Sequence, residues 1–339
     1  MMTIKEIANL SGVSKSTVSR VLNNNGYVNQ ETREKVEKVI MEQDYTPSAA
    51  ARSLSKQETN TIGVIIPEID NSFFGEVIKG ITEIADDRNF SIICCDTQNS
   101  GEKEFRALRM LEHQRVRGII MTPAMGYSDI VSVKKLKSIL SKLNVPVVIV
   151  DRDFEHSSWD TVSYENYQSG YIATKSLIEA GNTEIGFIQG DMALKIAKDR
   201  FEGYLDAMEE FGYEVKEEYV LPGDFTVETA FILTKKAIEE GNLPKAIVTA
   251  NNRTTLGFMK ALRGKNLTIG KHIAVIGIDH EPLIDIFCDN FSCVSRDTEE
   301  MGRVSMRLLL KRMKDTNKGR NIVMIPCQLE LKGSEKVPN

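Results

Sequence analysis

The segment from residue 14 to residue 22 carries side chains that could read DNA. Lys15, Ser16 and Arg20 share the polar face of a short helical pattern. Arginine pairs bidentately with guanine, lysine reaches guanine or a phosphate, and serine can bond a base edge in either role. The chemistry expected of this face is hydrogen bonding to base edges in a major groove.

A second set of side chains, spread over the rest of the chain, could bind a small polar molecule. Asp151 and Arg152 directly follow one apolar strand pattern, Asn251 follows another, and Asp279 closes a third, whereas Arg200 begins a helical segment. Carboxylates and amides suit sugar hydroxyls, and arginine suits a hydroxyl or an anion. Arg200 and Asp279 could instead form a surface ion pair worth about 0–1 kcal/mol.

Two aromatic residues, Phe73 and Phe74, open a helical segment immediately after the first strand pattern. Either ring could stack on a sugar or a base, and either could equally belong to the hydrophobic core. Parallel α/β sheets bind ligands in the crevice beyond the carboxyl ends of their strands. We therefore expect these aromatic and polar residues to share one ligand site.

No arrangement of residues indicates catalysis, a metal site or an organic cofactor. The four histidines are scattered, and the chain has no HExxH, GxSxG or P-loop motif and no GxGxxG after the first strand. The five cysteines lack CxxC spacing. We expect them to be reduced core residues rather than disulfides or zinc ligands, and we expect no enzyme activity.

The composition indicates two or three globular domains outside a membrane. The 339 residues are 41% hydrophobic, and no apolar run reaches the roughly 18–20 residues that cross a bilayer. The N-terminus lacks an apolar signal core, so we expect a cytoplasmic location. The net charge is −5, yet residues 1–60 hold eight basic against seven acidic residues. Only this N-terminal segment is expected to attract nucleic acid.

The reading face must be held by a small helical head. Thr3 has capping-box spacing to the glutamate three residues later, Gly12 supplies a left-handed turn, and Ser14 caps the next helix. A third helix begins near Gln30. Helix, glycine turn and helix predict a helix-turn-helix, whose second helix lies in the major groove. The inward positions are Ile4, Ile7, Ala8, Thr17, Val18, Val21, Leu22, Val36, Val39 and Ile40.

A tether of small residues follows the head. It starts at Pro47 and ends in the apolar Leu54, which suits a short helix. Such a short helix is not stable alone in water, so we expect it to form only when it packs against a partner.

From residue 61 the chain alternates between short β-branched runs and helical segments. Continuous apolar strands separated by helices predict parallel sheets covered on both faces. The expected strands are 61–67, 90–95, 116–121, 145–150, 184–189, 246–249 and 273–278. The expected helices are 73–88, 102–114, 131–143, 166–180, 197–211, 227–240 and 252–264.

The order of motifs along the chain resembles the lactose/galactose repressor family. The motifs are Ile4-Lys5-Glu6-Ile7-Ala8, Gly12-Val13-Ser14, Thr17-Val18-Ser19-Arg20-Val21-Leu22-Asn23 and Ala51-Arg52-Ser53-Leu54. The resemblance covers practically the whole chain. It implies an N-terminal all-α helix-turn-helix head and an α/β body of two doubly wound parallel-sheet lobes, similar to periplasmic binding proteins.

The expected boundaries follow from this resemblance. The head is placed at residues 1–46, the hinge helix and linker at 47–60, and the effector-binding and dimerisation body at 61–339. The first lobe is expected to contain about residues 61–160 and 290–320, and the second lobe about residues 161–289 and 321–339.

The resemblance implies that a homodimer grips operator DNA with two heads and two hinge helices. Leu54 matches a leucine that wedges into the minor groove, opens a base step and bends the DNA. The residues expected to contact DNA are Thr3, Lys15, Ser16, Thr17, Ser19, Arg20, Asn23, Ala51 and Leu54.

The resemblance also implies a small-molecule effector between the lobes. Arg200 matches an effector-clamping arginine, and Phe225 matches an aromatic that stacks on the effector. Lys195 and Lys198, beside Arg200, raise the local positive charge. Lysines at such positions are usually solvated helix ends, but together with Arg152 they would suit an anionic effector such as a sugar acid or sugar phosphate. The expected effector-binding residues are Phe73, Phe74, Asp151, Arg152, Arg200, Phe225, Asn251 and Asp279.

Several positions depart from the family pattern. Asn252 stands where an aspartate usually follows Asn251, and Asn182 with Thr183 replaces a histidine. Glu165 stands where an aspartate usually precedes an asparagine, and the C-terminal segment after residue 330 lacks a common arginine. These departures weaken any transfer of a particular sugar to this chain and leave the fold assignment untouched.

The sequence therefore predicts a cytoplasmic, homodimeric repressor of carbohydrate or sugar-acid genes, controlled by a metabolite. One alternative is a catabolite-control-type regulator with a phosphoprotein corepressor, in which a Tyr-Asp pair of the contact helix aligns here with Glu299 and Glu300. A sugar-binding transport component is another alternative, against which the first 55 residues argue.

Overall fold

The computed structural model describes residues 2–22, 24–45, 59–127, 130–154, 157–315 and 319–337. The chain divides into two compact units, Met1–Thr59 and Asn60–Asn339. The expected hinge helix and the expected DNA contacts Asn23, Ala51 and Leu54 lie outside the described residues.

Among the described residues of the first unit, three helices form a head: α1 (Ile4–Ser11), α2 (Lys15–Leu22) and α3 (Gln30–Glu42). The capping box is formed, because Glu6 N–H donates to Thr3 and the Thr3 N–H donates to Glu6 at 2.7 Å. Gly12 ends α1 with φ 67°. Ile7, Val18 and Val36 are fully buried at the centre, which confirms the predicted helix-turn-helix head.

The second unit contains two six-stranded sheets. The first sheet has the order β2-β1-β3-β4-β5-β11, and all its pairs are parallel. Its strands are β1 (Thr61–Ile66), β2 (Ser91–Asp96), β3 (Gly118–Met121), β4 (Val147–Val150), β5 (Asp160–Tyr164) and β11 (Ile322–Ile325). Its helices are α5 (Ser72–Asp86), α6 (Gly101–His113), α7 (Ile130–Leu143) and α13 (Thr298–Lys314).

The second sheet has the order β7-β6-β8-β9-β10-β12, with β12 antiparallel to β10. Its strands are β6 (Ile185–Ile188), β7 (Val220–Leu221), β8 (Ala246–Thr249), β9 (Ala274–Ile278), β10 (Ser292–Arg296) and β12 (Cys327–Glu330). Its helices are α8 (Asn166–Glu179), α9 (Lys195–Glu210), α10 (Val227–Glu240), α11 (Asn252–Arg263) and α12 (Pro282–Phe287), with a 3-10 turn at Glu217–Tyr219. Among the described residues, no helix is long and apolar enough to cross a membrane.

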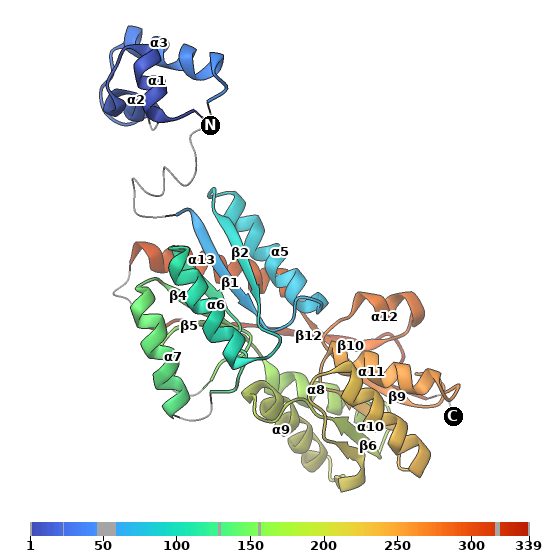
Figure 1. Cartoon of the computed structure of the whole chain (residues 1–339). Coiled ribbons are helices and arrows are strands. Elements are labelled where there is room, and N and C mark those ends of the chain that lie inside the picture. Colours follow the sequence, from blue (N-terminus) through green and yellow to red (C-terminus); the bar gives the residue numbers. More distant parts are fainter. Residues whose placement is uncertain are drawn as a thin grey trace. The chain divides into compact units, whose positions relative to one another are not determined.

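Helices cover both faces of each sheet, as the continuous apolar strands predicted (Figure 1). In β1, Ile62, Val64 and Ile66 pack on the side of α5 and α13, and Ile65 packs on the side of α6 and α7. Alternate residues of a strand point to opposite faces, so a strand between two helical layers must be apolar at every position. The predicted fold of two doubly wound lobes is confirmed.

The strand pairing corrects the expected lobe boundaries. β5 pairs with β4, so the first sheet extends beyond residue 160, and β11 returns to the first sheet although residues 321–339 were assigned to the second lobe. β10 pairs with β9, so the start of 290–320 belongs to the second sheet. The chain therefore crosses between the lobes after β5, after β10 and after β11.

The cysteines also differ from the expectation. All five are free, but only Cys293 is buried; Cys94 is exposed on β2, which is an edge strand. Cys95, Cys288 and Cys327 are partly exposed. The expectation of five core cysteines was therefore wrong.

Candidate ligand cleft and nucleic-acid interface

The strand order of each sheet places a crevice at the carboxyl ends of two particular strands. In the first sheet the chain leaves β1 toward β2 on one side and later adds β3 on the other; in the second sheet, β6 lies between β7 and β8 in the same way. Loops that leave such a pair in opposite directions open a crevice between them. The segments after β1, β6 and β8 therefore meet between the lobes.

The eight predicted effector residues all line one small cavity in this crevice. Its volume is about 30 Å³, which is room for about one water molecule. The lobes are thus closed on their own side chains. The lining residues are Glu68, Asn71, Phe73, Phe74, Asp151, Arg152, Ile196, Arg200, Phe225, Asn251, Asn252, Asp279 and Arg296.

Arg296 is the central residue of the cavity, and the sequence analysis did not identify it. Its side chain is 3% exposed and lies 3.1 Å from Asp151 of the first lobe and 3.1 Å from Asp279 of the second. The guanidinium carbon lies 4.2 Å from the Phe73 ring centre and 4.1 Å from the Tyr164 ring centre. One arginine therefore bridges both lobes by charge and by stacking.

The strand that ends in Arg296 gave a weak signal. β10 reads Ser-Cys-Val-Ser-Arg, with small polar residues where strands such as β1 and β4 have β-branched ones. It is nevertheless buried up to Ser295, because its hydroxyls have partners: Ser295 donates to Glu330 at 2.6 Å, and Ser292 donates to Glu335 at 2.6 Å. A search of the sequence for charged residues that end a short run of serine and apolar residues would have found Arg296.

Arg200 is held deep in the second lobe. It is 1% exposed and donates to Asn166 at 2.9 Å and to the carbonyl of Ala250 at 2.6 Å. Its nearest contact to Asp279 is 3.6 Å. The alternative of a surface ion pair is therefore wrong, because both partners are buried.

Arg152 reaches the same cavity from the first lobe. It donates to Asn99 at 2.7 Å and to the carbonyl of Pro123 at 3.2 Å. Burial lowers the pKa of Arg152, in spite of Asp151 nearby. Burial would also lower the pKa of Arg296, but Asp279 and Asp151 outweigh it and raise that pKa. Both guanidinium groups remain charged.

Three of the cavity residues have an uncommon backbone conformation. Asp151, Phe225 and Asp279 have φ of 65°, 69° and 69°, a region that residues other than glycine seldom adopt. Strained positions of this kind gather at binding sites, where the surrounding structure holds them. Gly190 makes room for Phe225, since a Cβ there would lie 2.1 Å from the ring.

The remaining predicted residues have mixed roles. Phe73 and Phe74 are buried and pack edge to face, 4.9 Å apart, so they belong to the core and to the cavity wall. Asn251 caps α11 by accepting from Thr254 N–H at 2.8 Å. Lys195 and Lys198 are exposed and do not line the cavity. The positive charge expected from these lysines is supplied by Arg296 instead.

The head presents the predicted DNA-reading residues on its surface. Lys15, Ser16 and Arg20 of α2 are exposed, and so is Thr3; Thr17 and Ser19 are partly buried. The hydroxyls of Ser16 and Thr17 contact the Ser14 hydroxyl at 2.7 and 2.9 Å, which orders the first turn of α2. Tyr27, 90% exposed in the turn before α3, was not identified from sequence.

Comparison with known proteins decides the family. Residues 3–48 match the family described as "Bacterial regulatory proteins, lacI family", and residues 59–332 match "Periplasmic binding proteins and sugar binding domain of LacI family". The chain belongs to the lacI family. It is therefore a DNA-binding transcriptional regulator and not an enzyme.

Full-length members of the family are similar to this chain. The HTH-type transcriptional repressor PurR of Vibrio campbellii is 33% identical over 340 residues, with 100% of both chains covered. The Lac repressor bound to ONPG in the repressed state is 25% identical with a TM-score of 0.84, covering 98% of this chain and 99% of that one. The regulator CcpA of Lactococcus lactis is 25% identical with a TM-score of 0.72, covering 81% and 98%.

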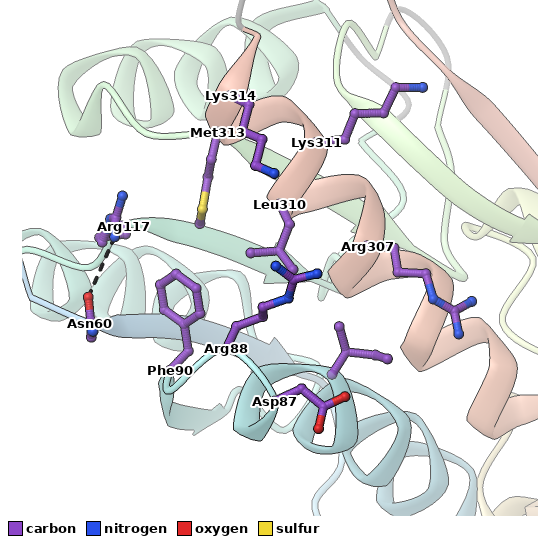
Figure 2. A pocket seen from close by; sticks show the side chains of 11 residues that line it. Asn60, Asp87, Arg88, Phe90, Arg117, Arg307, Leu310, Lys311, Met313 and Lys314 are labelled. Atoms are coloured by element: carbon purple, nitrogen blue, oxygen red, sulfur yellow. Dashed lines mark hydrogen bonds between the residues drawn. The ribbon is translucent and has the colours of Figure 1, made fainter.

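A larger hollow lies on the first lobe of this lacI-family body, away from the cleft. Its volume is about 660 Å³, and it lies between the end of α5 and the second half of α13. Figure 2 shows Arg88, Phe90 and Leu310 converging on it from these two regions. The lining is basic around an apolar floor: Asn60, Ile84, Asp87, Arg88, Phe90, Arg117, Arg307, Leu310, Lys311, Met313 and Lys314.

Proposed function

We propose that the protein is a cytoplasmic, homodimeric repressor whose operator affinity is controlled by a small anionic metabolite bound between the lobes. One observation carries the choice of an anion. Arg152 Nε, Arg200 Nη2 and Arg296 Nε are buried without a hydrogen-bond partner among the described residues, although all three side chains line the cavity. Unpartnered buried donors are costly.

A ligand that supplies acceptors would satisfy these donors. Asp151 and Asp279 each lie within ion-pair distance of an arginine, but Asp279 Oδ1 is buried without a hydrogen-bond partner among the described residues. The cavity lining therefore has three unpartnered arginine nitrogens against one unpartnered carboxylate oxygen. A carboxylate or phosphate group forms charge-assisted bonds to guanidinium groups and suits them in bidentate geometry. Sugar acids and sugar phosphates combine such a group with hydroxyls for Asn251, and a flat face for Phe225.

Control of DNA binding follows from the position of the cleft. A ligand can shift the arrangement of the lobes only by binding one arrangement better than the other. The hinge segments are expected to form helices only when a dimer holds them together at the operator.

Leu54 would then wedge into the minor groove of the operator. Leu54→Ala is therefore expected to reduce the bending of the DNA in a circular-permutation gel. Equal bending by the two proteins would contradict the wedge.

A thermal-shift screen tests the ligand class directly. The full chain is heated with matched sets of neutral sugars, sugar acids, sugar phosphates and purines. A ligand that binds the folded state raises the melting temperature by mass action, and we expect this for an acid or phosphate and not for its neutral parent. The ligand found should change operator affinity in a footprint. A shift with neutral ligands alone would contradict the anionic class.

The second candidate is regulation by a phosphoprotein. The hollow between the end of α5 and the second half of α13 favours this candidate, because Arg88, Lys311 and Lys314 in its lining have no ion pair within 4 Å among the described residues. Against it, Glu299 and Glu300 at the start of α13 are paired with Lys79, Arg303 and Arg307. Capture of a phosphorylated carrier protein that is lost in Lys311→Glu would favour this candidate over the metabolite.

A further inference from the structure

The mouth of the cleft is closed by a polar cluster that joins the two lobes. Asn252 is 1% exposed, and its side-chain amide lies 3.0 Å from Asn71 Oδ1 and 3.1 Å from Ser72 Oγ, both in the first lobe. The same amide lies 3.0 Å from Glu281 of its own lobe. Ser72 donates to Glu281 at 2.7 Å across the gap.

We propose that Asn252 is a positioning residue that latches the two lobes in the closed arrangement. The proposal rests on the proposed function, since the latch sets the equilibrium that the effector must shift. Asn252 supplies N–H donors where the neighbouring groups, Asn71 Oδ1, Glu281 and Ser72 Oγ, can all accept. Its own Oδ1 is occupied by the Arg253 N–H at 2.9 Å.

The residue type at position 252 is decisive. An aspartate would have nearly the same shape but no donor, and its charge would lie beside the Glu281 carboxylate. Two like charges at hydrogen-bond distance in a buried site repel strongly. The amide therefore permits the carboxylate of Glu281 to bridge the lobes, where a carboxylate at 252 would push them apart.

Neighbouring contacts place the latch at a seam rather than within a lobe. Arg253 forms an ion pair with Asp70 of the first lobe at 3.1 Å and lies 3.9 Å from Glu68. Farther along the seam, Gly126 packs so closely on the carbonyl of Ala193 that a Cβ would lie 2.0 Å from it. Breaking the Asn252 cluster would release one end of this seam while each sheet stays intact.

The test compares full-length wild type with Asn252→Asp in the absence of effector and DNA. Small-angle X-ray scattering reports the opening of the lobes, and hydrogen–deuterium exchange reports the segments 68–76 and 250–256. We expect a larger radius of gyration and exchange of these segments that is about tenfold faster, because two cross-lobe bonds are lost and a like charge is added.

Two further variants separate opening from simple damage. Asn182→Asp makes the same substitution inside the second lobe, where the amide donates to Leu177 and Glu335 carbonyls at 2.8 and 2.9 Å. It should lower the melting temperature without changing the radius of gyration. The double variant Asn252→Asp/Glu281→Gln returns an amide beside a carboxylate and should restore closure in large part.

The outcome decides the proposal independently of the ligand. If Asn252→Asp keeps the wild-type radius of gyration and exchange, or if Asn182→Asp opens the lobes equally, Asn252 is not a latch. Failure to find an anionic effector would contradict the proposed function and leave this measurement unaffected, since neither effector nor DNA is present in it.

Discussion

The head and the cleft are stabilised in opposite ways. Among the described residues, the head has a core of five buried apolar side chains, and its helices α1 and α3 begin and end with caps made within a few residues. The cleft is formed by charged groups that are far apart in sequence, such as Arg296 and Asp151, which are 145 residues apart. A local cap contributes about 1 kcal/mol, whereas a buried charge without its partner costs several times as much.

This difference assigns different consequences to damage in the two regions. In the head, Lys15 and Arg20 are exposed on α2, so removing one should change DNA binding while the fold persists. In the cleft, the residues that would bind the effector also hold the lobes together. Loss of function and loss of stability are therefore separable in the head and coupled in the cleft.

Removing Arg296 should have the largest effect on stability. Arg296→Met leaves Asp151 and Asp279 buried without the cation that they share. We expect the free energy of unfolding of the body to fall by about 3–5 kcal/mol. The control is Arg307→Met, which removes an arginine paired with Glu300 at a half-exposed site and should cost less than about 1 kcal/mol. Differential scanning calorimetry measures both. Equal melting temperatures would mean that the cleft charges do not hold the body.

Removing Arg200 should separate effector response from DNA binding. Arg200→Ala deletes a buried clamp that donates to Asn166 and Ala250, and a hydrogen bond to a charged group contributes about 1.5–3 kcal/mol. We expect the effector affinity to fall by at least tenfold while operator affinity in the absence of effector is kept. Isothermal titration calorimetry with the ligand measures the effector affinity, and footprinting of the operator measures the operator affinity. Unchanged effector affinity would place the site elsewhere.

Much of the fold was predictable because its signals are local. Thr3, Gly12 and Ser14 mark helix ends by their own chemistry, and apolar runs such as residues 246–249 must be buried strands. The lobe boundaries were not predictable in this way. β10, β11 and β12 are short and partly polar or exposed, and only their pairing partners, far away in sequence, assign them to a sheet.

The cleft was predictable wherever a residue follows a strand. Asp151 and Asp279 come directly after β4 and β9, and Asn251 comes two residues after the end of β8. The topology of a parallel sheet brings such positions together. Lys195 and Lys198 were misplaced because nearness in sequence to Arg200 does not fix the face of a helix. Arg296 was missed because β10 itself was missed.

In the head, Arg20 should dominate sequence recognition. Arg20→Ala is expected to weaken operator binding by about 1–3 kcal/mol and to relax the preference at one base pair in each half-site. Lys38→Ala on α3 removes the same charge from an exposed side chain and should leave the base preference unchanged. Quantitative footprinting on operator variants measures both. Wild-type preference in Arg20→Ala would show that another residue reads that base pair.

The smallest effect is expected at the capping box. Thr3→Ala removes the hydroxyl that accepts from the Glu6 N–H, and loss of such a cap costs about 0.5–2 kcal/mol. Amide exchange within α1 of the full chain should therefore quicken severalfold, while exchange within the body sheets stays at the wild-type rate.

Hydrogen bonds from the backbone and the hydroxyl of Thr3 lower the pKa of Glu6 from its ordinary 4.5. The ionised form thus favours folding above that pH, and this contribution is lost as the pH falls below it. The difference in α1 exchange rate between wild type and Thr3→Ala should become smaller in acid without vanishing, since the hydrogen bond from the Glu6 N–H to the Thr3 hydroxyl does not depend on ionisation. A difference that is constant with pH would show that the hydroxyl acts through the cap alone.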